Sequence, residues 1–266
     1  MTDNTGNVDV LVRTFNSGRT LRRCLESINK NIKYSRILIA DRNSTDETIS
    51  ISREFDCMIM QEDCGIGKAT NLLIANSSTE NVLFVDSDVI VLRDDFLSKS
   101  IDLLRKPSTG AVVGLSSRYI FKFGLPLGLT LMRRRDLLRI QIPDWVQGRE
   151  TYYIQEFLRR NRLKVRYIQG AMIHEGTYRS YRYWPEWQGA AIQATGSHAR
   201  QLLKATGIVA MMHLNTRSVR NFAYSPIFYY RLLRGFFNPE KFGYADRRKI
   251  SETDFPGTQV RLEVKK

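Results

Sequence analysis

Two aspartates separated by one residue are the feature of this sequence with the clearest chemistry. Asp86, Ser87 and Asp88 directly follow the apolar run Val82–Val85, which predicts a short buried strand. Both carboxylates are therefore expected at a strand end, where they could hold one hard cation together with a phosphate. Mg²⁺ is usually bound by one or two carboxylates plus substrate phosphates, and Mn²⁺ accepts similar oxygen donors. The same three residues also fit a solvated turn, because Asp and Ser are common in turns.

Strand-like runs and helical patterns alternate through the first hundred residues. Short apolar runs predict strands at residues 8–12, 36–40, 58–61 and 81–85. Apolar residues at helical spacing predict intervening helices at residues 20–32, 49–55 and 69–75. This order predicts an α/β fold with a mostly parallel sheet and helices on both faces, in a doubly wound, Rossmann-like arrangement.

Polar residues recur where each of these strands ends. Ligands of such sheets bind outside the carboxyl ends of the strands, so these residues are the ones expected at a site. They are Arg13–Asn16, Asp41–Asn43, Asp63–Gly65 and Asp86–Asp88. Their recurrence favours a binding site over a set of unrelated turns.

The rest of the chain is less regular. Strands are predicted at residues 110–115, 128–132 and 164–168, and a helix at residues 151–161. From residue 177 onward the chain is rich in Tyr, Trp, Phe and Arg and shows several helical patterns. We expect two domains, residues 1–176 and residues 177–266, the second being basic, aromatic and helical.

Charge is distributed unevenly along the chain. Residues 1–110 carry 14 Lys and Arg against 16 Asp and Glu, whereas residues 111–176 carry 12 against 5 and residues 177–250 carry 12 against 3. A strongly basic second half indicates an anionic partner such as a nucleic acid, an acidic membrane surface or a phosphorylated substrate. A solvated basic face without a partner is the simpler alternative.

Composition limits the class of protein. A chain of 266 residues with 42% hydrophobic and 26% charged residues is typical of a folded globular protein and excludes disordered and collagen-like classes. No run approaches the roughly 18 to 20 apolar residues that cross a bilayer, and the polar first residues do not predict a signal peptide. Cys24, Cys57 and Cys64 form no CxxC pair, so we expect reduced thiols in a cytoplasmic protein.

Four segments of the first half resemble motifs of the family 2 glycosyltransferases, which have the GT-A fold. Val10–Asn16 resembles that family's first strand and turn, and Asp41–Thr48 resembles its "DDGSTDGT" turn. Gly65–Asn71 resembles its "G-x-x-x-A-x-N" helix start, and Asp86–Asp88 resembles its DxD motif. The order and spacing of the four segments match the family.

Two departures from the family pattern are visible within these four segments. Arg13 stands where proline is common, and Arg42 and Asn43 replace Asp-Gly.

The resemblance implies a site for a nucleoside diphosphate sugar, such as a UDP- or GDP-sugar. Thr14 and Phe15 would line the nucleobase pocket, with the aromatic ring as a stacking face, and Asp41 would accept hydrogen bonds from the base or ribose. Lys68, near a helix N-terminus, would meet the base or diphosphate, because both dipole and charge favour an anion there. The donor-binding residues implied are Thr14, Phe15, Asn16, Asp41, Lys68, Asp86 and Ser87.

The resemblance also implies a bound Mn²⁺ or Mg²⁺. Asp86 would contact the ribose or the metal, and Asp88 would hold the metal against the diphosphate. His174 lies where the family has a histidine after the catalytic helix, so it would ligate the metal or bind the leaving phosphate. A structural role is the alternative for His174.

Inverting transfer needs a carboxylate base near the acceptor hydroxyl. The family usually carries it in a Glu-Asp pair that opens a helix. Glu150 matches the base position, with Arg149 in place of the usual glutamate. Glu150 could instead interact only with the helix dipole, and Asp144 is the reserve candidate. If the acceptor is itself a phosphate anion, no base is strictly required.

The aromatic and basic second half fits three interpretations. Arginine interleaved with aromatic residues is found in single-stranded nucleic-acid binders, at membrane interfaces and in ordinary packed helices. Because the first half resembles a sugar transferase, we favour peripheral contact with an anionic membrane at the inner face of the cell membrane, and we expect no nucleic-acid partner.

The sequence therefore predicts an inverting, metal-dependent glycosyltransferase whose acceptor is lipid-linked, of the polyprenyl phosphate or diphosphate type, or a glycan. A nucleotidyltransferase is one alternative, although residues 13–18 are a poor version of its Gly-rich loop. A non-enzymatic nucleic-acid-binding protein is the other, although it leaves the two aspartates unexplained.

Overall fold

The computed structural model describes residues 8–119, 122, 124–175, 184–196, 198–215 and 223–242. The chain forms two compact units. The first comprises Met1–Ser117 and Gly124–Gly176, and the second comprises Arg118–Phe123 and Thr177–Lys266. A role of the second unit in acceptor or membrane contact stays a prediction.

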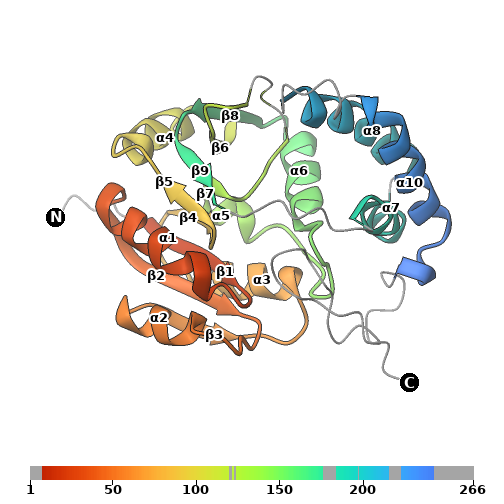
Figure 1. Ribbon diagram of the computed structural model, residues 1–266. Helices are drawn as coiled ribbons and strands as arrows, with labels where there is room; N and C mark the ends of the chain where they lie inside the picture. Colours follow the sequence, from red (N-terminus) through yellow and green to blue (C-terminus); the bar gives the residue numbers. More distant parts are fainter. Residues whose placement is uncertain are drawn as a thin grey trace. The chain divides into compact units, whose positions relative to one another are not determined.

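A seven-stranded sheet forms the centre of the first unit, in the order β3-β2-β1-β4-β7-β6-β8 (Figure 1). Its strands are β1 (Val8–Thr14), β2 (Tyr34–Asp41), β3 (Met58–Gln61), β4 (Asn81–Asp86), β6 (Thr109–Leu115), β7 (Leu129–Arg133) and β8 (Lys164–Gln169). Strands β3, β2, β1 and β4 run parallel to one another, as β6 and β8 do, whereas β7 is antiparallel to both β4 and β6. The predicted mostly parallel sheet is confirmed.

A two-stranded ribbon stands beside this sheet. It consists of β5 (Val89–Val91) and β9 (Met172–His174), paired antiparallel. Neither strand was predicted, because three residues are too few for a periodic pattern to be recognised. The ribbon matters because it brings the end of the first unit beside the Asp86–Asp88 turn.

Helices cover both faces of the sheet. Val10 and Val12 of β1 join the same buried cluster as Leu21 and Leu25 of the first helix. The intervening Leu11 is equally buried but faces the opposite side, because successive side chains of a strand alternate. The helices of this unit are α1 (Gly18–Asn31), α2 (Thr48–Glu54), α3 (Ile66–Asn76), α4 (Phe96–Leu104), α5 (Arg134–Leu137) and α6 (Glu150–Arg160).

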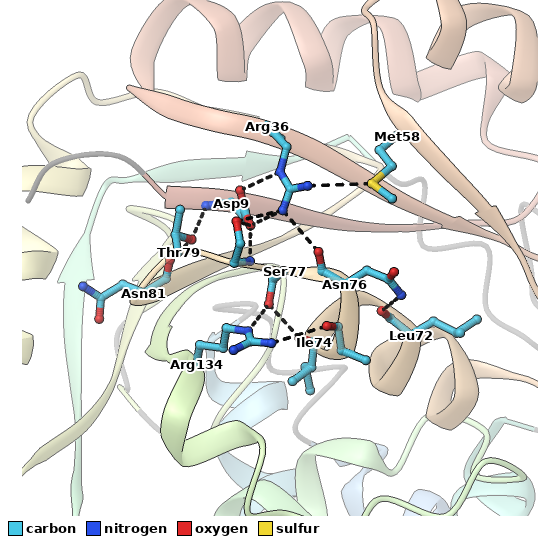
Figure 2. Close-up of polar contacts among 12 residues, drawn as sticks. Asp9, Arg36, Met58, Leu72, Ile74, Asn76, Ser77, Thr79, Asn81 and Arg134 are labelled. Carbon is cyan, nitrogen blue, oxygen red and sulfur yellow. Dashed lines mark hydrogen bonds and ion pairs between the residues drawn. The ribbon is translucent and has the colours of Figure 1, made fainter. Parts of the chain in front are cut away.

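An ion pair between a buried aspartate and a partly exposed arginine joins the amino ends of β1 and β2 (Figure 2). The carboxylate of Asp9 is fully buried and accepts hydrogen bonds from Arg36 at 2.9 Å and from the Ser78 amide at 2.6 Å. Burial alone would raise the pKa of Asp9, but the bonds from Arg36 and the backbone lower it below its ordinary value. Arg36 also donates to the carbonyl of Asn76, so the pair ties two strands to the end of α3.

The second unit is helical in its described residues. It contains α7 (Trp184–Thr195), α8 (His198–Asn215), α10 (Ser225–Phe237) and a 3₁₀ turn, η1 (Glu240–Phe242). Helices α7 and α10 contact each other through glycines. A Cβ on Gly189 would lie 1.9 Å from the Leu232 carbonyl oxygen, and one on Gly235 would lie 1.8 Å from the Glu186 carbonyl oxygen. Larger residues at either position would force the two backbones apart.

Buried Glu186 anchors the same helix pair. Arg231 donates to both of its carboxylate oxygens at 2.8 Å, and Arg234 lies 3.7 Å from one of them.

Within the described chain, none of the helices combines the length and apolarity needed to span a bilayer.

Candidate active site

An arginine at the end of β1 joins two acidic side chains. Arg13 pairs across the sheet with Asp86 of β4, so the two side chains emerge together. The Nη1 of Arg13 donates to the Oε1 of Glu150 at 2.6 Å, and its Nη2 donates to the Oδ1 of Asp86 at 2.9 Å. Burial would lower the pKa of Arg13, but the charges of Glu150 and Asp86 raise it well above its ordinary value. The guanidinium is therefore a permanent cation at this sheet edge.

The β5–β9 ribbon brings His174 to the aspartate turn. The Nδ1 of His174 lies 3.3 Å from the Oδ1 of Asp88, and the Glu175 amide donates to the Asp88 carbonyl at 2.8 Å. Burial would raise the pKa of Asp88 and lower that of His174, but their hydrogen bond and mutual attraction shift both in the opposite sense. This contact orients the imidazole, and its Nε2 points away from Asp88.

Gly128 leaves a small space between His174 and Asp86. A Cβ at this position would lie 3.1 Å from the Nε2 of His174 and 3.2 Å from the Oδ2 of Asp86. The Gly128 carbonyl also accepts the Asp86 amide at 3.0 Å. One imidazole nitrogen and one carboxylate oxygen thus converge on a point that any other residue would fill.

This donor set suits a divalent cation that is held jointly with a phosphate. Among the residues that the structure describes, no three His, Cys, Asp or Glu side chains are grouped to hold a metal by themselves. Mg²⁺ needs only one or two protein carboxylates when phosphates complete its shell, and Mn²⁺ also accepts imidazole. Asp86, Asp88 and His174 supply those donor types.

Asp41 lies in the interior, where neighbouring residues donate hydrogen bonds to its carboxylate. The side chain is fully buried. Its Oδ1 accepts from the Thr14 hydroxyl at 2.7 Å and the Ser44 hydroxyl at 2.6 Å, and its Oδ2 accepts from the Ser44 amide at 2.7 Å. These bonds fix the turn after β2 against the end of β1. Asp41 therefore stabilises the conformation of the loops at the strand ends.

Phe15 and Asn16 follow Thr14 at this edge. The guanidinium carbon of Arg42 lies 6.0 Å from the centre of the Phe15 ring, and Arg42 also reaches Gln147 at 3.4 Å. Asn16 adopts a left-handed backbone with φ 46° and accepts the Thr45 amide through its Oδ1 at 2.9 Å. The half-buried Phe15 ring therefore lies in a loop that is held by side-chain contacts.

Ser87 links the aspartate turn to α1. Its hydroxyl lies 2.9 Å from that of Ser17, the residue that precedes the helix. The two serines join the loops after β1 and β4.

Lys68 lies in the first turn of α3, as the sequence predicts. Two backbone amides of that turn are already bonded: Gly67 donates to the Val146 carbonyl at 2.8 Å and Lys68 donates to the Asp144 carbonyl at 3.1 Å. The Lys68 amine lies 3.3 Å from Asp63 and is about one-third exposed. Only its side-chain charge is thus presented to an anion.

Glu150 and Asp144, the two proposed bases, occupy different surroundings. Glu150 is the first residue of α6 and is buried, and its Oε2 has no hydrogen-bond partner within the described part of the chain. Asp144 is exposed and accepts from Asn71 of α3 at 2.8 Å. The structure therefore joins Glu150, and not Asp144, to the Arg13–Asp86 group.

The contacts of three residues at this edge were not predicted from the sequence. Arg13 was expected at the site as a strand-end residue and was visible as a departure from proline, but its two partners lie far away in sequence. Gly128 was only the start of a predicted strand, and Gln147, which donates to the Cys64 carbonyl at 2.8 Å, lies in an irregular segment. The tertiary contacts that give these residues their roles have no local sequence signal.

Comparison with known proteins decides the family. Residues 9–172 match the family described as glycosyl transferase family 2. The chain belongs to this family. The resemblance seen in the four sequence motifs is confirmed. Family membership favours sugar transfer over the nucleotidyltransferase and nucleic-acid-binding alternatives.

Curated relatives match parts of the chain. The glycosyltransferase GlyA of Streptococcus pneumoniae serotype 4 is 35% identical over 94 residues, which are 33% of this chain and 14% of that protein. N-acetylglucosaminyltransferases of a Rhizobium species and of Bradyrhizobium elkanii are 34% and 32% identical over 119 residues. Those matches cover 40% of this chain and 26% and 64% of the two relatives. The chain thus spans less than two thirds of each.

Solved structures show the fold. Glucosyl-3-phosphoglycerate synthase from Mycobacterium tuberculosis, in complex with Mn²⁺, UDP and glucosyl-3-phosphoglycerate, superposes with a TM-score of 0.53 at 18% identity. A second structure of that enzyme, with Mg²⁺ and UDP, gives 0.53 at 17% identity, and both cover 64% of this chain and 72% of the other. The predicted GT-A fold is confirmed.

Proposed function

We propose that this glycosyltransferase moves a sugar from a nucleoside diphosphate sugar to an acceptor with inversion at the anomeric carbon, aided by Mn²⁺ or Mg²⁺. The observation that carries the proposal is the convergence of Arg13, Glu150, Asp86 and His174 at the carboxyl edge of the sheet. This edge is where ligands of such sheets bind.

The donor is proposed to lie across the ends of β1, β2 and β4. Thr14, Phe15 and Asn16 would border the nucleobase, with the Phe15 ring as a stacking face. Asp41, whose carboxylate is buried and already accepts three hydrogen bonds, would fix Thr14 and the following turn. Lys68 would add positive charge toward the donor.

The diphosphate and metal are proposed to lie beside the Asp86–Asp88 turn. Asp88 and His174 would hold the cation and Asp86 the cation or ribose, with Ser87 fixing the turn through Ser17. A bound divalent cation would supply positive charge that stabilises the departing nucleoside diphosphate. The space at Gly128 supports this placement.

Glu150 is proposed as the general base. Its Oε1 is held by Arg13, and its Oε2 has no partner among the described residues, so Oε2 can accept the proton when the acceptor group is a hydroxyl. An acceptor that is itself a phosphate anion would need no base. The acceptor oxygen then bonds to the anomeric carbon as the bond from that carbon to the phosphate oxygen breaks. The electron pair leaves with the nucleoside diphosphate, and attack from the opposite face inverts the centre.

A thermal-shift screen tests the donor site. Purified protein is heated with UDP, GDP or dTDP, each with Mn²⁺, Mg²⁺ or EDTA. A ligand that binds only the native state raises the melting temperature by mass action, so we expect one nucleotide to raise it with metal and not with EDTA. The absence of any shift would contradict the proposed donor site.

We propose a lipid-linked acceptor of the polyprenyl phosphate or diphosphate type, reached from the inner face of the cell membrane, with a glycan as the alternative. One face of α10 supports membrane contact. Exposed residues recur on it every three or four positions, which places them on one side of a helix, while Phe228 and Leu232 are buried on the other. The exposed residues are Ile227, Tyr230, Arg234 and Phe237.

Charge complementarity favours an anionic surface. In the sequence, Arg217 and Arg220 precede this helix, and Arg247, Arg248 and Lys249 follow it. Apolar and aromatic side chains beside basic residues are typical of helices that bind anionic lipid surfaces.

Vesicle sedimentation tests this contact. We expect the protein to sediment with vesicles containing phosphatidylglycerol and not with pure phosphatidylcholine, and the triple variant Ile227→Ser, Tyr230→Ser, Phe237→Ser to bind at least tenfold more weakly. The control carries Met58→Ser and Leu138→Ser, two exposed apolar residues of the first unit, and should bind normally. Equal binding by the triple variant would exclude this face.

A further inference from the structure

Arg13 occupies a position that the family commonly gives to proline, and it makes contacts that proline could not make. Its side chain is only 14% exposed, and the carboxylates of Glu150 and Asp86 that it contacts are 7% and 35% exposed. Two nitrogens of one planar group thus hold a carboxylate at the start of α6 and another at the end of β4.

The geometry of the guanidinium fixes both partners together. Its donors form a rigid fork, so each bonded oxygen has a defined direction. On Glu150 the fork takes Oε1 and leaves the buried Oε2 without a partner among the described residues. On Asp86 it takes Oδ1 and leaves Oδ2 facing the space at Gly128.

We propose that Arg13 is a positioning residue that sets the general base and the donor-binding carboxylate in register. It turns the Oε2 of Glu150 toward the acceptor hydroxyl and the Oδ2 of Asp86 toward the donor. One guanidinium thus orients the two carboxylates that align the attacking and leaving groups. This inference rests on the proposed function, because it assigns Arg13 a part in the transfer step.

A purely structural ion pair is the competing explanation. In that case loss of Arg13 would lower stability, and activity would fall only as the folded fraction falls. Arg36 offers a matched control, because it also pairs with a buried aspartate, Asp9, at 2.9 Å but lies at the amino end of the strands, opposite the candidate site.

The experiment compares Arg13→Lys, Arg13→Ala and Arg36→Ala with wild type. The readout is release of nucleoside diphosphate from UDP-glucose, UDP-N-acetylglucosamine, GDP-mannose or dTDP-glucose, using the donor that wild type hydrolyses fastest. Thermal shift with the matching nucleotide and Mn²⁺ measures donor binding separately. All assays run well below the melting temperature of the least stable variant.

We expect Arg13→Lys to bind nucleotide within about threefold of wild type and to lose at least tenfold in kcat, since a small misplacement of a catalytic group can cost about 100-fold. Arg13→Ala should lose more and recover several-fold when guanidinium chloride is added at low millimolar concentration, but not when sodium chloride is added. Arg36→Ala should melt earlier and keep kcat within about twofold.

Two results would overturn the inference. Arg13 variants that keep wild-type kcat, or a loss that follows melting temperature as in Arg36→Ala and is not rescued by guanidinium, would show a structural pair only. If wild-type protein neither binds nor hydrolyses any of the four donors, the proposed function itself fails. The two failures are thus distinguishable.

Discussion

At the scale of single residues, the site depends on how each carboxylate divides its two oxygens. Both oxygens of Asp41 accept hydrogen bonds from Thr14 or Ser44. Glu150 and Asp86 each use one oxygen to accept a hydrogen bond from Arg13. A carboxylate can accept about four hydrogen bonds; Asp41 already accepts three from the chain, whereas the Oε2 of Glu150 has no partner among the described residues. This difference separates residues that act on ligands from those that shape the loops.

The identity of the base is tested by isosteric amides. Glu150→Gln keeps the shape of the side chain and a hydrogen bond to Arg13 but cannot take a proton, so we expect kcat to fall by about 10² to 10⁴-fold with donor affinity nearly unchanged. Asp144→Asn is the control and should stay within a few-fold of wild type. Steady-state kinetics of nucleoside diphosphate release measure both, and the reverse pattern would make Asp144 the base.

The space at Gly128 gives a second prediction. In Gly128→Ala the new methyl group would lie against His174 and Asp86, so we expect metal-dependent nucleotide affinity to fall at least tenfold with a small change in stability. Titration with the nucleotide and Mn²⁺ measures this. Gly207→Ala, at a helical position with open space around it, controls for the substitution itself; unchanged affinity in Gly128→Ala would contradict the placement.

Sequence and structure agree least at this residue scale. Asp86, Asp88 and His174 were predicted as site residues from motif and spacing, but the contacts of their side chains were not predicted. The Asp88–His174 contact depends on the β5–β9 ribbon, and the partners of Arg13 come from β4 and α6. Such contacts are set by tertiary structure and leave no local periodicity.

At the scale of elements, prediction succeeded where runs were apolar and bounded by polar residues. The strand at 58–61 has the predicted bounds, and the helix at 20–32 is found at Gly18–Asn31. The antiparallel direction of β7 was not predicted, because strand periodicity is the same in both directions. Since β7 lies between β4 and β6, it separates the two parallel parts of the sheet.

The Asp9–Arg36 pair predicts a pH dependence of stability. The folded-state pKa of Asp9 is depressed below its ordinary value of 3.8, so its contribution is complete above that value and is lost as pH falls through the folded-state pKa. We expect the difference in unfolding free energy between wild type and Asp9→Asn to be about 1 to 3 kcal/mol near pH 7. It should shrink at pH values below 3.8.

Urea titrations at pH 7, 5, 4 and 3 measure this difference. Glu54→Gln is a matched control, because Glu54 pairs with Arg22 on the exposed surface and such pairs contribute little. A wild-type advantage over Asp9→Asn that grows toward low pH would have the wrong sign and would contradict the assignment.

At the scale of the whole molecule, charge and chemistry are divided between the two units. The first unit carries the family match, which ends at residue 172, and all the proposed catalytic residues. The second unit carries much of the basic excess, yet Arg231 and Arg234 lie against Glu186. Part of that excess therefore stabilises the helices, and an anionic partner would meet what remains.

Metal-dependent turnover of a nucleotide sugar tests the central claim most directly. Release of nucleoside diphosphate is followed with the preferred donor for wild type and Asp88→Ala, with Mn²⁺ and with EDTA. The proposed mechanism predicts turnover by wild type with Mn²⁺ only, and a loss of at least 100-fold in Asp88→Ala, consistent with loss of electrostatic stabilisation of the leaving group. Full activity of Asp88→Ala, or turnover by wild type that persists in EDTA, would contradict it.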